Sequence, residues 1–264
     1  MTGYFSDVWR LRHFWLALVR IDLRKRYRRS VLGMGWSLLQ PIAMMIVLCA
    51  VFGQIFDVSV REYAPLLLSG LTFWAFIMAV VLQGCQCFFM GESYIRQHPA
   101  PLAIYPLRTT LAAGFHFLVG FAITLAFVWA LNGFGNLPAL LSLAPTFLLL
   151  FLVGWSLSVC MGLANVLFQD SQHLIEVFMQ VMFYLTPIMY KPEMLTTRLQ
   201  RHHLAWLMDL NPFAVFLEMI RKPLLEGQLA STSVMYHGAL FAILAVLTAG
   251  LALKRFEKQM IFYL

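Results

Sequence analysis

Charged side chains are scarce in this sequence, and their scarcity indicates the class of protein. Of 264 residues, 12% are charged and 61% are hydrophobic, and the mean hydropathy is +0.77. A water-soluble domain carries about twice that charged fraction, so the excess of apolar side chains requires a lipid solvent. The net charge of +7 does not indicate nucleic acid, because basic residues in membrane proteins ordinarily anchor and orient the chain.

Signatures of catalysis and of metal binding are also lacking. The sequence contains no GxxxxGK[ST] phosphate-binding loop, so we expect no ATP site of that kind. Its four cysteines lie inside apolar segments, and Cys85-Gln-Cys87 lacks the spacing of a redox or zinc pair. We interpret the cysteines as small buried hydrophobic residues. No catalytic, cofactor or metal site is predicted, and no cleavable signal peptide, because the first apolar run begins only near Trp36.

The apolar segments predict an all-α membrane protein that forms one transmembrane domain over residues 1–264. A helix needs about 20 apolar residues to cross the hydrocarbon core. The predicted spans are residues 36–56, 64–88, 107–132, 139–166, 173–190 and 236–254. The fifth is short and contains Glu176 and Gln180. Residues 191–235 hold apolar pieces too short to span, which we interpret as short gate helices outside the membrane or dipping into it.

The distribution of basic residues predicts the orientation. Most of the 19 Lys and Arg residues fall in the N-terminal segment, in the loop after the second span and in the C-terminal tail. An even number of spans puts these three regions on one side, and loops rich in Lys and Arg remain in the cytoplasm. Both termini are therefore expected in the cytoplasm and residues 191–235 outside.

The N-terminal segment, residues 1–35, is expected to be cytoplasmic and to lie on the membrane surface. Residues 5–23 place apolar side chains close to one helical face, with arginine and tryptophan residues among them. An amphipathic helix of this composition lies in the interface rather than across the membrane. The alternative is that the segment acts only as an orientation signal.

The stretch from Arg20 to Pro41 carries a dense set of spacings. Arg20 and Asp22 precede a basic run around Tyr27, after which a serine, a Leu-Gly pair and a tryptophan lead to Pro41. This pattern resembles the N-terminal signature of the permease subunits of ABC exporters for polysaccharides and polyol phosphates. The matching positions are Arg20, Asp22, Arg26, Tyr27, Arg28, Ser30, Leu32, Gly33, Trp36 and Pro41.

In such an exporter the basic cluster would receive a lipid phosphate from the inner leaflet, since arginine makes bidentate contacts with phosphate. The alternative for each cation is anchoring alone at the anionic membrane surface. The residues predicted to admit the lipid phosphate are Arg20, Arg24, Lys25, Arg26, Arg28 and Arg29.

The loop from Glu92 to Leu107 is similar to the family's cytoplasmic loop, in which a short coupling helix precedes a turn punctuated by prolines. The resemblance implies that this helix docks on the ATP-hydrolysing subunit, and Tyr and Arg are common in interfaces. A rigid turn with no partner is the alternative. The predicted docking residues are Glu92, Tyr94, Ile95, Arg96 and His98.

Aromatic residues cluster in two further family-like stretches, one containing Gly70 and Trp74 and the other running from Phe183 to Tyr190. Aromatic faces stack on sugars, and Tyr and Trp add a polar group. An interfacial aromatic belt is the competing interpretation, favoured for Trp74. The residues predicted to line a conduit are Phe73, Trp74, Phe183, Tyr184 and Tyr190.

The resemblance implies an ATP-driven exporter of a lipid-linked, O-antigen-like polysaccharide in a bacterial inner membrane. Six spans are few for a wide conduit, so we expect a homodimer with two ATPase subunits. Alternative substrates are capsule, teichoic acid, lipid or drug. A membrane-embedded enzyme acting on lipid-linked glycan is less favoured, because Asp170 and His173 lack a third partner. A structural protein or receptor leaves the motifs unexplained, and an ion-coupled carrier is disfavoured because His116, His237 and Glu176 each stand alone.

Overall fold

The computed structural model describes residues 2–27, 33–97, 100–133, 136–190, 211–257 and 259–263. All regular elements within these ranges are helical, which confirms the predicted all-α class. The elements are α1 (Thr2–Arg10), α2 (Arg12–Tyr27), η1 (Gly33–Gly35), α3 (Trp36–Ile55), α4 (Val60–Gln86), η2 (Phe89–Gly91), α5 (Glu92–Gln97), α6 (Ile104–Asn132), α7 (Leu137–Leu141), α8 (Leu143–Leu167), α9 (Ser171–Leu185), α12 (Pro212–Arg221), η3 (Lys222–Glu226), α13 (Thr232–Phe256) and α14 (Met260–Tyr263).

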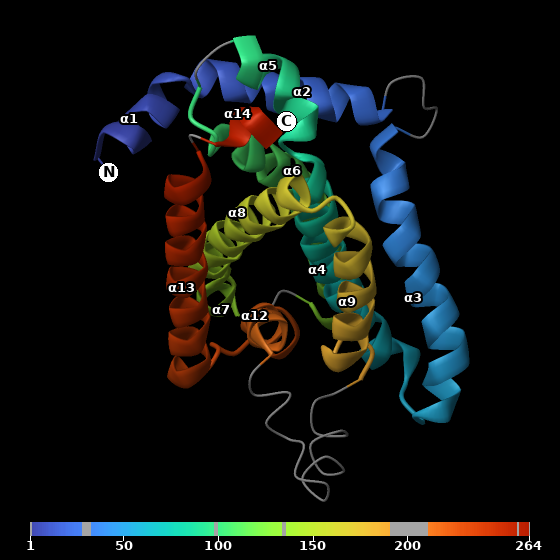
Figure 1. Ribbon diagram of the computed structural model, residues 1–264. Coiled ribbons are helices and arrows are strands. Elements are labelled where there is room, and N and C mark those ends of the chain that lie inside the picture. Colours follow the sequence, from blue (N-terminus) through green and yellow to red (C-terminus); the bar gives the residue numbers. More distant parts are fainter. Residues whose placement is uncertain are drawn as a thin grey trace, which may run out of the picture.

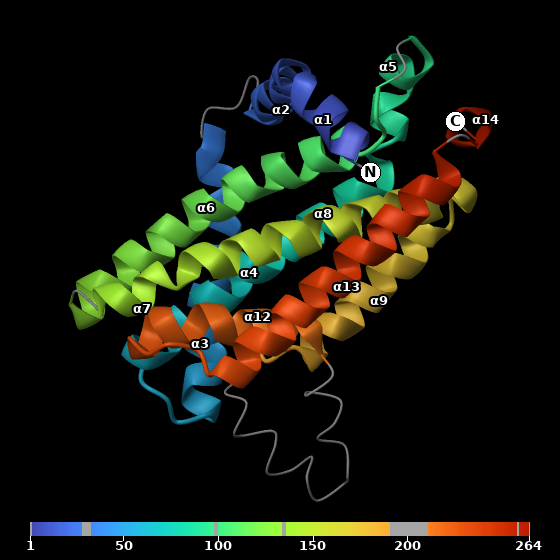
Figure 2. The same cartoon turned by 90° about the vertical axis from the view of Figure 1, so that its left-hand side faces the viewer.

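The long helices form a bundle whose two ends differ. Helices α3, α4, α6, α8, α9 and α13 run along it, whereas α1, α2, α5 and α14 gather at one end together with both termini (Figures 1 and 2). We call this the terminal end. Helix α12 lies at the opposite end, which we call the far end.

Four stretches of the bundle are long and apolar enough to cross a membrane. They are Val60–Gln86, Ile104–Leu131, Leu137–Leu167 and Thr232–Phe256, while the apolar part of α3, Leu39–Ile55, is shorter. Helix α9, with 15 residues, is about 22 Å long at 1.5 Å per residue, which is less than the roughly 30 Å of the hydrocarbon core. The chain is thus a multi-pass membrane protein, and the number of six membrane-spanning helices is still a prediction.

Helix α4 is the centre of the bundle, and most of its side chains are buried. It approaches α8 so closely that a Cβ atom on Gly84 would lie 2.7 Å from the Cα of Ser158. A Cβ atom on Gly162 of α8 would lie 2.8 Å from the carbonyl oxygen of Gly84. Small residues permit this contact, as they do between helices in membranes generally.

Several predicted boundaries need correction. The fifth span was expected to reach Tyr190, but α9 ends at Leu185 because Thr186 is extended, with φ −86° and ψ 134°. The residue before a proline is disfavoured in helical conformation, and Pro187 follows. The amphipathic segment forms two helices, α1 and α2, that break at Leu11, and α4 and α6 begin a few residues earlier than predicted.

Candidate functional site

Helix α2 separates its charges between two faces at the terminal end. The side chains of Arg20, Arg24 and Lys25 are exposed, as expected of cations that meet an anionic surface. Asp22 points the other way and forms a two-pronged ion pair with Arg108 at the start of α6. The side chains of Arg108 and Asp22 are 7% and 19% exposed. Of the other predicted phosphate contacts, Arg28 and Arg29 lie outside the described residues, as does the side chain of Arg26.

Helix α5 presents only part of its predicted docking surface. Glu92 and Arg96 are exposed and pair with each other at 2.8 Å. Tyr94 is 37% exposed, and its ring packs edge-on against Phe14 of α2, with centroids 5.7 Å apart. Ile95 is buried and anchors the helix to the bundle. His98 lies outside the described residues.

Behind α5, the two residues before α6 collect contacts from three other parts of the chain. Tyr4 of α1 accepts a hydrogen bond from the backbone N–H of Ala103 at 3.2 Å. Glu257, just after α13, accepts one from the N–H of Leu102 at 3.4 Å, and Trp155 of α8 donates to the Ala103 carbonyl at 3.3 Å. We call Leu102–Ala103 the hub, because a movement of these two residues would pull on α1, α8 and the end of α13 through these hydrogen bonds.

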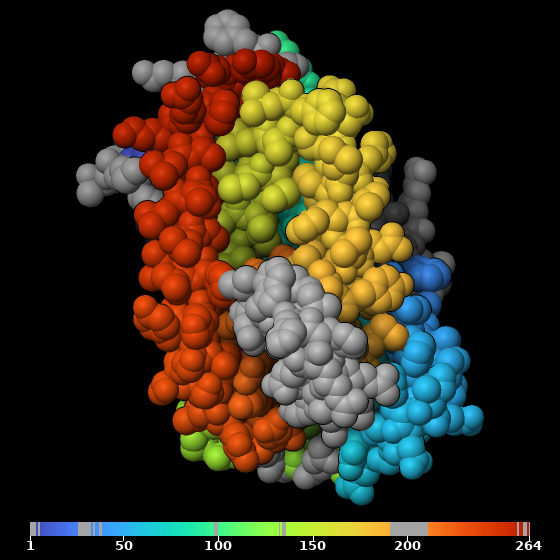
Figure 3. Space-filling model, turned by 60° about the horizontal axis from the view of Figure 1, so that its bottom comes forward, coloured from blue at the N-terminus to red at the C-terminus, as the bar shows by residue number. Residues whose placement is uncertain are grey.

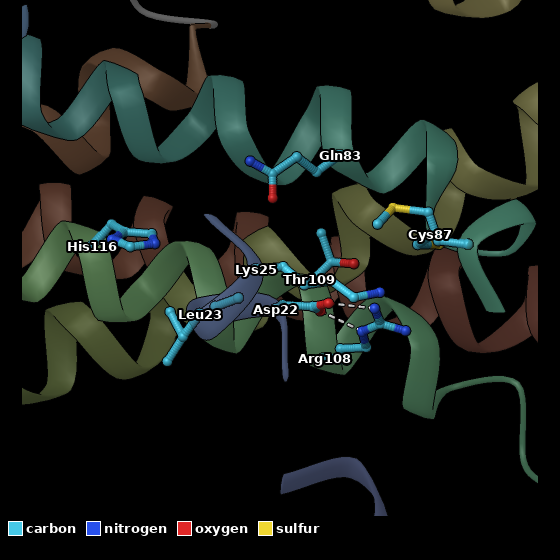
Figure 4. A pocket seen from close by; sticks show the side chains of 10 residues that line it. Asp22, Leu23, Lys25, Gln83, Cys87, Arg108, Thr109 and His116 are labelled. Atoms are coloured by element: carbon cyan, nitrogen blue, oxygen red, sulfur yellow. Dashed lines mark hydrogen bonds and ion pairs between the residues drawn. The ribbon is translucent and has the colours of Figure 1, made fainter. Parts of the chain in front are cut away.

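One cavity lies beside the ion pair, and a second, larger cavity adjoins it. The smaller, about 270 Å³, is lined by side chains of α2, α4 and α6 that converge on it (Figure 4), among them Asp22, Lys25, Gln83, Arg108 and His116. The larger, about 1040 Å³, runs between α3 and the pair α4 and α6, and its walls are mostly apolar. Gln83 and His116 line both cavities, so the two adjoin. Together they form an elongated site, polar at one end and apolar along its length.

Arg221 organises the far end. Its side chain is buried, and it donates to the carbonyl oxygens of Leu66 at 2.9 Å and Ile188 at 2.8 Å, to Ser69 Oγ at 3.4 Å and to the Pro187 carbonyl. No carboxylate pairs with it among the residues that the structure describes. It therefore connects the end of α12 to α4 and to the turn after α9.

The turn after α9 is fastened from two further positions. Asn211 caps α12 by accepting a hydrogen bond from the N–H of Phe213, and it donates to Thr186 Oγ1 at 3.0 Å. Tyr63 of α4 donates to the Met189 carbonyl at 2.8 Å. Both ends of α12 are thus tied to the same turn.

The predicted conduit residues do not share one environment. Phe73 is completely buried in the core. Trp74 is also buried and packs edge-on against Phe183 at 5.6 Å. Tyr184 projects from α9 and is 64% exposed, and Tyr190 donates to its backbone carbonyl at 3.0 Å. That these residues line a conduit is still a prediction, and the exposed aromatic residues that support it lie at the end of α9.

The view from the far end shows what α9 presents to its surroundings. Helix α8 is recessed between α13 and α9, and α3 lies on the other side of α9 (Figure 3). The outward face of α9 is open and mostly apolar. The residues exposed there are Leu174, Val177, Phe178, Val181 and Tyr184, with Gln180 among them.

Three features were missed by sequence reasoning. Sequence reasoning assigned no structural role to Arg108 or Arg221, although buried arginines in an apolar chain ordinarily mark a function. Gly70 had been matched to the family without a reason; a Cβ atom there would lie 2.7 Å from Arg221 Nη2, so the glycine makes room for the guanidinium. In the described part of the chain no three His, Cys, Asp or Glu side chains are grouped to hold a metal, and His173 is exposed.

Comparison with known proteins gives concordant matches. Residues 13–225 match the family described as ABC-2 type transporter. The chain is 24% identical over 227 residues to the O-antigen export system permease protein RfbA of Klebsiella pneumoniae, covering 86% of this chain and 83% of that protein. A protein of the same name from Myxococcus xanthus is 23% identical over 72% of this chain and 73% of its own length. The polysialic acid transport protein KpsM of Escherichia coli is 20% identical over 92% of this chain and 93% of its own length. The resemblance predicted from the sequence is confirmed.

Proposed function

The chain belongs to the ABC-2 type transporter family, and from this premise we propose that it is the membrane-spanning permease subunit of an ATP-driven polysaccharide exporter. Its cargo is a lipid-linked, O-antigen-like glycan, carried across a bacterial inner membrane. The observation that carries this proposal is the similarity over most of the chain to permeases named for O-antigen export. A polysialic acid-like glycan is the second candidate, because one relative is named for that cargo.

The energy source is a separate ATPase, present in two copies on a homodimer of this chain. The sequence contains no phosphate-binding loop, and α5 offers exposed Glu92, Tyr94 and Arg96 for docking. The hub lies directly behind α5, so movement of the docked helix reaches α1, α8 and α13. The open apolar faces of α9 and α3 are available to the second copy.

The terminal end faces the cytoplasm in this proposal. The exposed cations of α2 then lie at the inner leaflet, where anionic lipid attracts them. Arg20 and Arg24, whose side chains are exposed on α2, receive the lipid phosphate of the cargo there. At the far end, α12 and the turn after α9 form the outer gate, held to α4 by Arg221.

Copurification tests the proposal as a whole. The chain is purified under mild detergent from its native membrane, and the copurifying proteins are identified by mass spectrometry. We expect an ATPase with a phosphate loop in a 1:1 ratio to this chain, and loss of surface glycan when the chain is deleted. Absence of any such ATPase together with unchanged glycan would overturn the proposal.

A charge reversal on α5 tests the docking site. Glu92→Arg or Arg96→Glu alone breaks their surface pair and alters the presented charge, so each should uncouple ATP hydrolysis from glycan export while the protein stays folded. The double reversal is the matched control for local structure, since it restores the internal pair with the charges exchanged. If the double variant exports as well as the wild type, then α5 needs only its internal pair and the charge-specific docking site is wrong.

A further inference from the structure

The adjoining cavities beside Asp22 and Arg108 carry a further inference. Helix α3 is packed unevenly on the bundle. Leu48 and Cys49 in its middle are buried, whereas Trp36, Leu39 and Met44, nearer the terminal end, are exposed. The larger cavity lies along this half, between α3 and the pair α4 and α6. The terminal half of α3 thus stands beside a space that the chain does not fill.

The shape of this space suits a lipid chain. Its wall on α4 extends from Leu68 to Gln83, which is about 22 Å at 1.5 Å per residue and more than the half-thickness of a hydrocarbon core of about 30 Å. The walls are apolar along most of that length, with Leu68, Leu71 and Met78 among them. A volume of about 1040 Å³ is at the upper limit for small-molecule pockets.

The charge at the polar end suits one kind of head group. The smaller cavity holds Lys25, Arg108 and Asp22, and the last two neutralise each other as an ion pair. Among the lining side chains that the structure describes, and with histidine taken as neutral, the balance is a single positive charge. A phosphodiester carries one negative charge, so it matches this balance, while a diphosphate carries about two. Gln83 and Thr109 supply polar groups for the remaining oxygens of a head group.

We propose that these cavities bind one anionic phospholipid, with its phosphodiester at Lys25 and Arg108 and an acyl chain between α3 and α4. The lipid acts as a wedge that holds the terminal half of α3 at its distance from α4 and α6. The occupant is identified by charge and length. A zwitterionic lipid brings an additional cation beside Lys25 and Arg108, and a free phosphate leaves the apolar cleft empty.

Native mass spectrometry of the full permease complex tests this proposal. The complex is reconstituted in nanodiscs that contain equal parts of phosphatidylglycerol and phosphatidylcholine, then transferred to detergent and delipidated stepwise. We expect one phosphatidylglycerol per chain to remain when phosphatidylcholine has been removed. Lys25→Glu should lower its retention about tenfold, because one charge-assisted contact of about 1.4 kcal/mol is lost. Arg255→Glu, which changes the charge of an exposed cation at the end of α13, is the matched control and should retain the lipid.

A second variant tests the acyl chain independently of charge. Ala75 lines the larger cavity and is exposed to it, so Ala75→Trp fills the cleft without disturbing the core and should also release the lipid. Ile243→Trp on the exposed face of α13 controls for the added ring. Equal retention of both phospholipids, or unchanged retention in Lys25→Glu and Ala75→Trp, would overturn the proposal.

Competition distinguishes the other occupants. Inorganic phosphate at millimolar concentration should leave the bound phosphatidylglycerol in place, because it gains nothing from the apolar cleft. Displacement by inorganic phosphate would overturn the acyl-chain contact, and displacement by equimolar polyprenyl diphosphate would reassign the site to the lipid carrier of the cargo. Since lipid retention is measured without nucleotide or transport, its outcome is independent of whether the exporter function holds.

Discussion

The two ends of the bundle hold a buried arginine in different ways. At the terminal end Arg108 pairs with a carboxylate, Asp22, which belongs to a surface helix and is 19% exposed. At the far end Arg221 has three carbonyl oxygens and one hydroxyl as its described partners, and these come from two separate segments, α4 and the turn after α9. An ion pair at a wet edge is exchangeable, because water can take the place of either partner. A guanidinium that satisfies several carbonyls at once is a fixed junction, since every partner loses its donor if the arginine moves.

The largest effect is expected from removing the far-end junction. In Arg221→Met the carbonyls of Leu66, Pro187 and Ile188 lose their shared donor inside the bundle. Hydrogen bonds from a charged group contribute about 1.5–3 kcal/mol each, offset in part by the relief of burying the charge. We expect the free energy of unfolding to fall by about 4 kcal/mol, measured by chemical denaturation of the purified chain in detergent.

Lysine at the same position separates charge from geometry. Arg221→Lys keeps the cation, but its single ammonium group cannot reproduce the planar fork of donors that reaches carbonyls on both α4 and the turn after α9. It should therefore lose most of the same stability. If Arg221→Lys were as stable as the wild type, the far end would depend on a point charge, and the contrast between the two ends would disappear.

A smaller loss is expected from breaking the ion pair at the terminal end. Asp22→Ala leaves Arg108 largely buried without a carboxylate, which costs about 3–5 kcal/mol in a fully buried pair; because Asp22 is partly exposed, we expect about 2 kcal/mol. Since α2 is held to α6 through this pair, ATP hydrolysis should also become less tightly coupled to export. Denaturation and the ratio of ATP hydrolysed to glycan exported measure the two effects.

The double variant Asp22→Ala/Arg108→Met removes both charges and should recover part of the stability, as replacement of whole ion pairs by apolar residues often does. Coupling should remain impaired, because the ion pair that joins α2 to α6 is then gone. Full recovery of coupling in the double variant would contradict a role for the pair in transmission.

Features that depend on neighbouring residues could be predicted from the sequence, whereas contacts between residues far apart in the chain could not. Helices α3, α4, α6, α8 and α13 are local consequences of apolar runs, so composition finds them. The end of α9 is not found in that way, because apolar residues continue beyond it and only Pro187 interrupts the helix. The exposed cations of α2 and the helix α5 were predicted from local motifs. The pair Asp22–Arg108 joins residues 86 positions apart, and no local pattern specifies which distant carboxylate meets a buried arginine.

A comparable contrast appears at Gly70. The sequence shows that Gly70 belongs to a family-like motif. A glycine is required there because the guanidinium of Arg221, 151 residues away along the chain, occupies the space that a Cβ atom would need. Gly70→Ala puts a methyl group against Arg221 Nη2 and the carbonyl oxygen of Ile188, and overpacking of this kind costs about 1–3 kcal/mol. We expect a loss of about 1.5 kcal/mol in the free energy of unfolding, measured as for Arg221→Met.

The double variant Gly70→Ala/Arg221→Met tests whether the two residues act together. The methyl group then meets no guanidinium, so the second substitution should add less than 0.5 kcal/mol to the loss caused by Arg221→Met alone, a departure from additivity of about 1 kcal/mol. Additive losses would mean that Gly70 is required by Ile188 or by α4 itself rather than by the arginine.

The smallest effect is expected at the hub. Tyr4 Oη accepts the hydrogen bond of the Ala103 N–H, and burial, with a lesser contribution from Glu257, holds the pKa of Tyr4 well above its usual range. The phenol therefore stays protonated throughout the physiological range. Tyr4→Phe removes the hydrogen bond from the Ala103 amide and the contact of the phenol with Glu257, and we expect the free energy of unfolding to fall by about 1 kcal/mol, equally at pH 7 and pH 9. The change should nevertheless loosen α1 from the start of α6, which hydrogen exchange at the Ala103 amide measures directly. Unchanged exchange at that amide would mean that Trp155 and Glu257 hold the hub without α1.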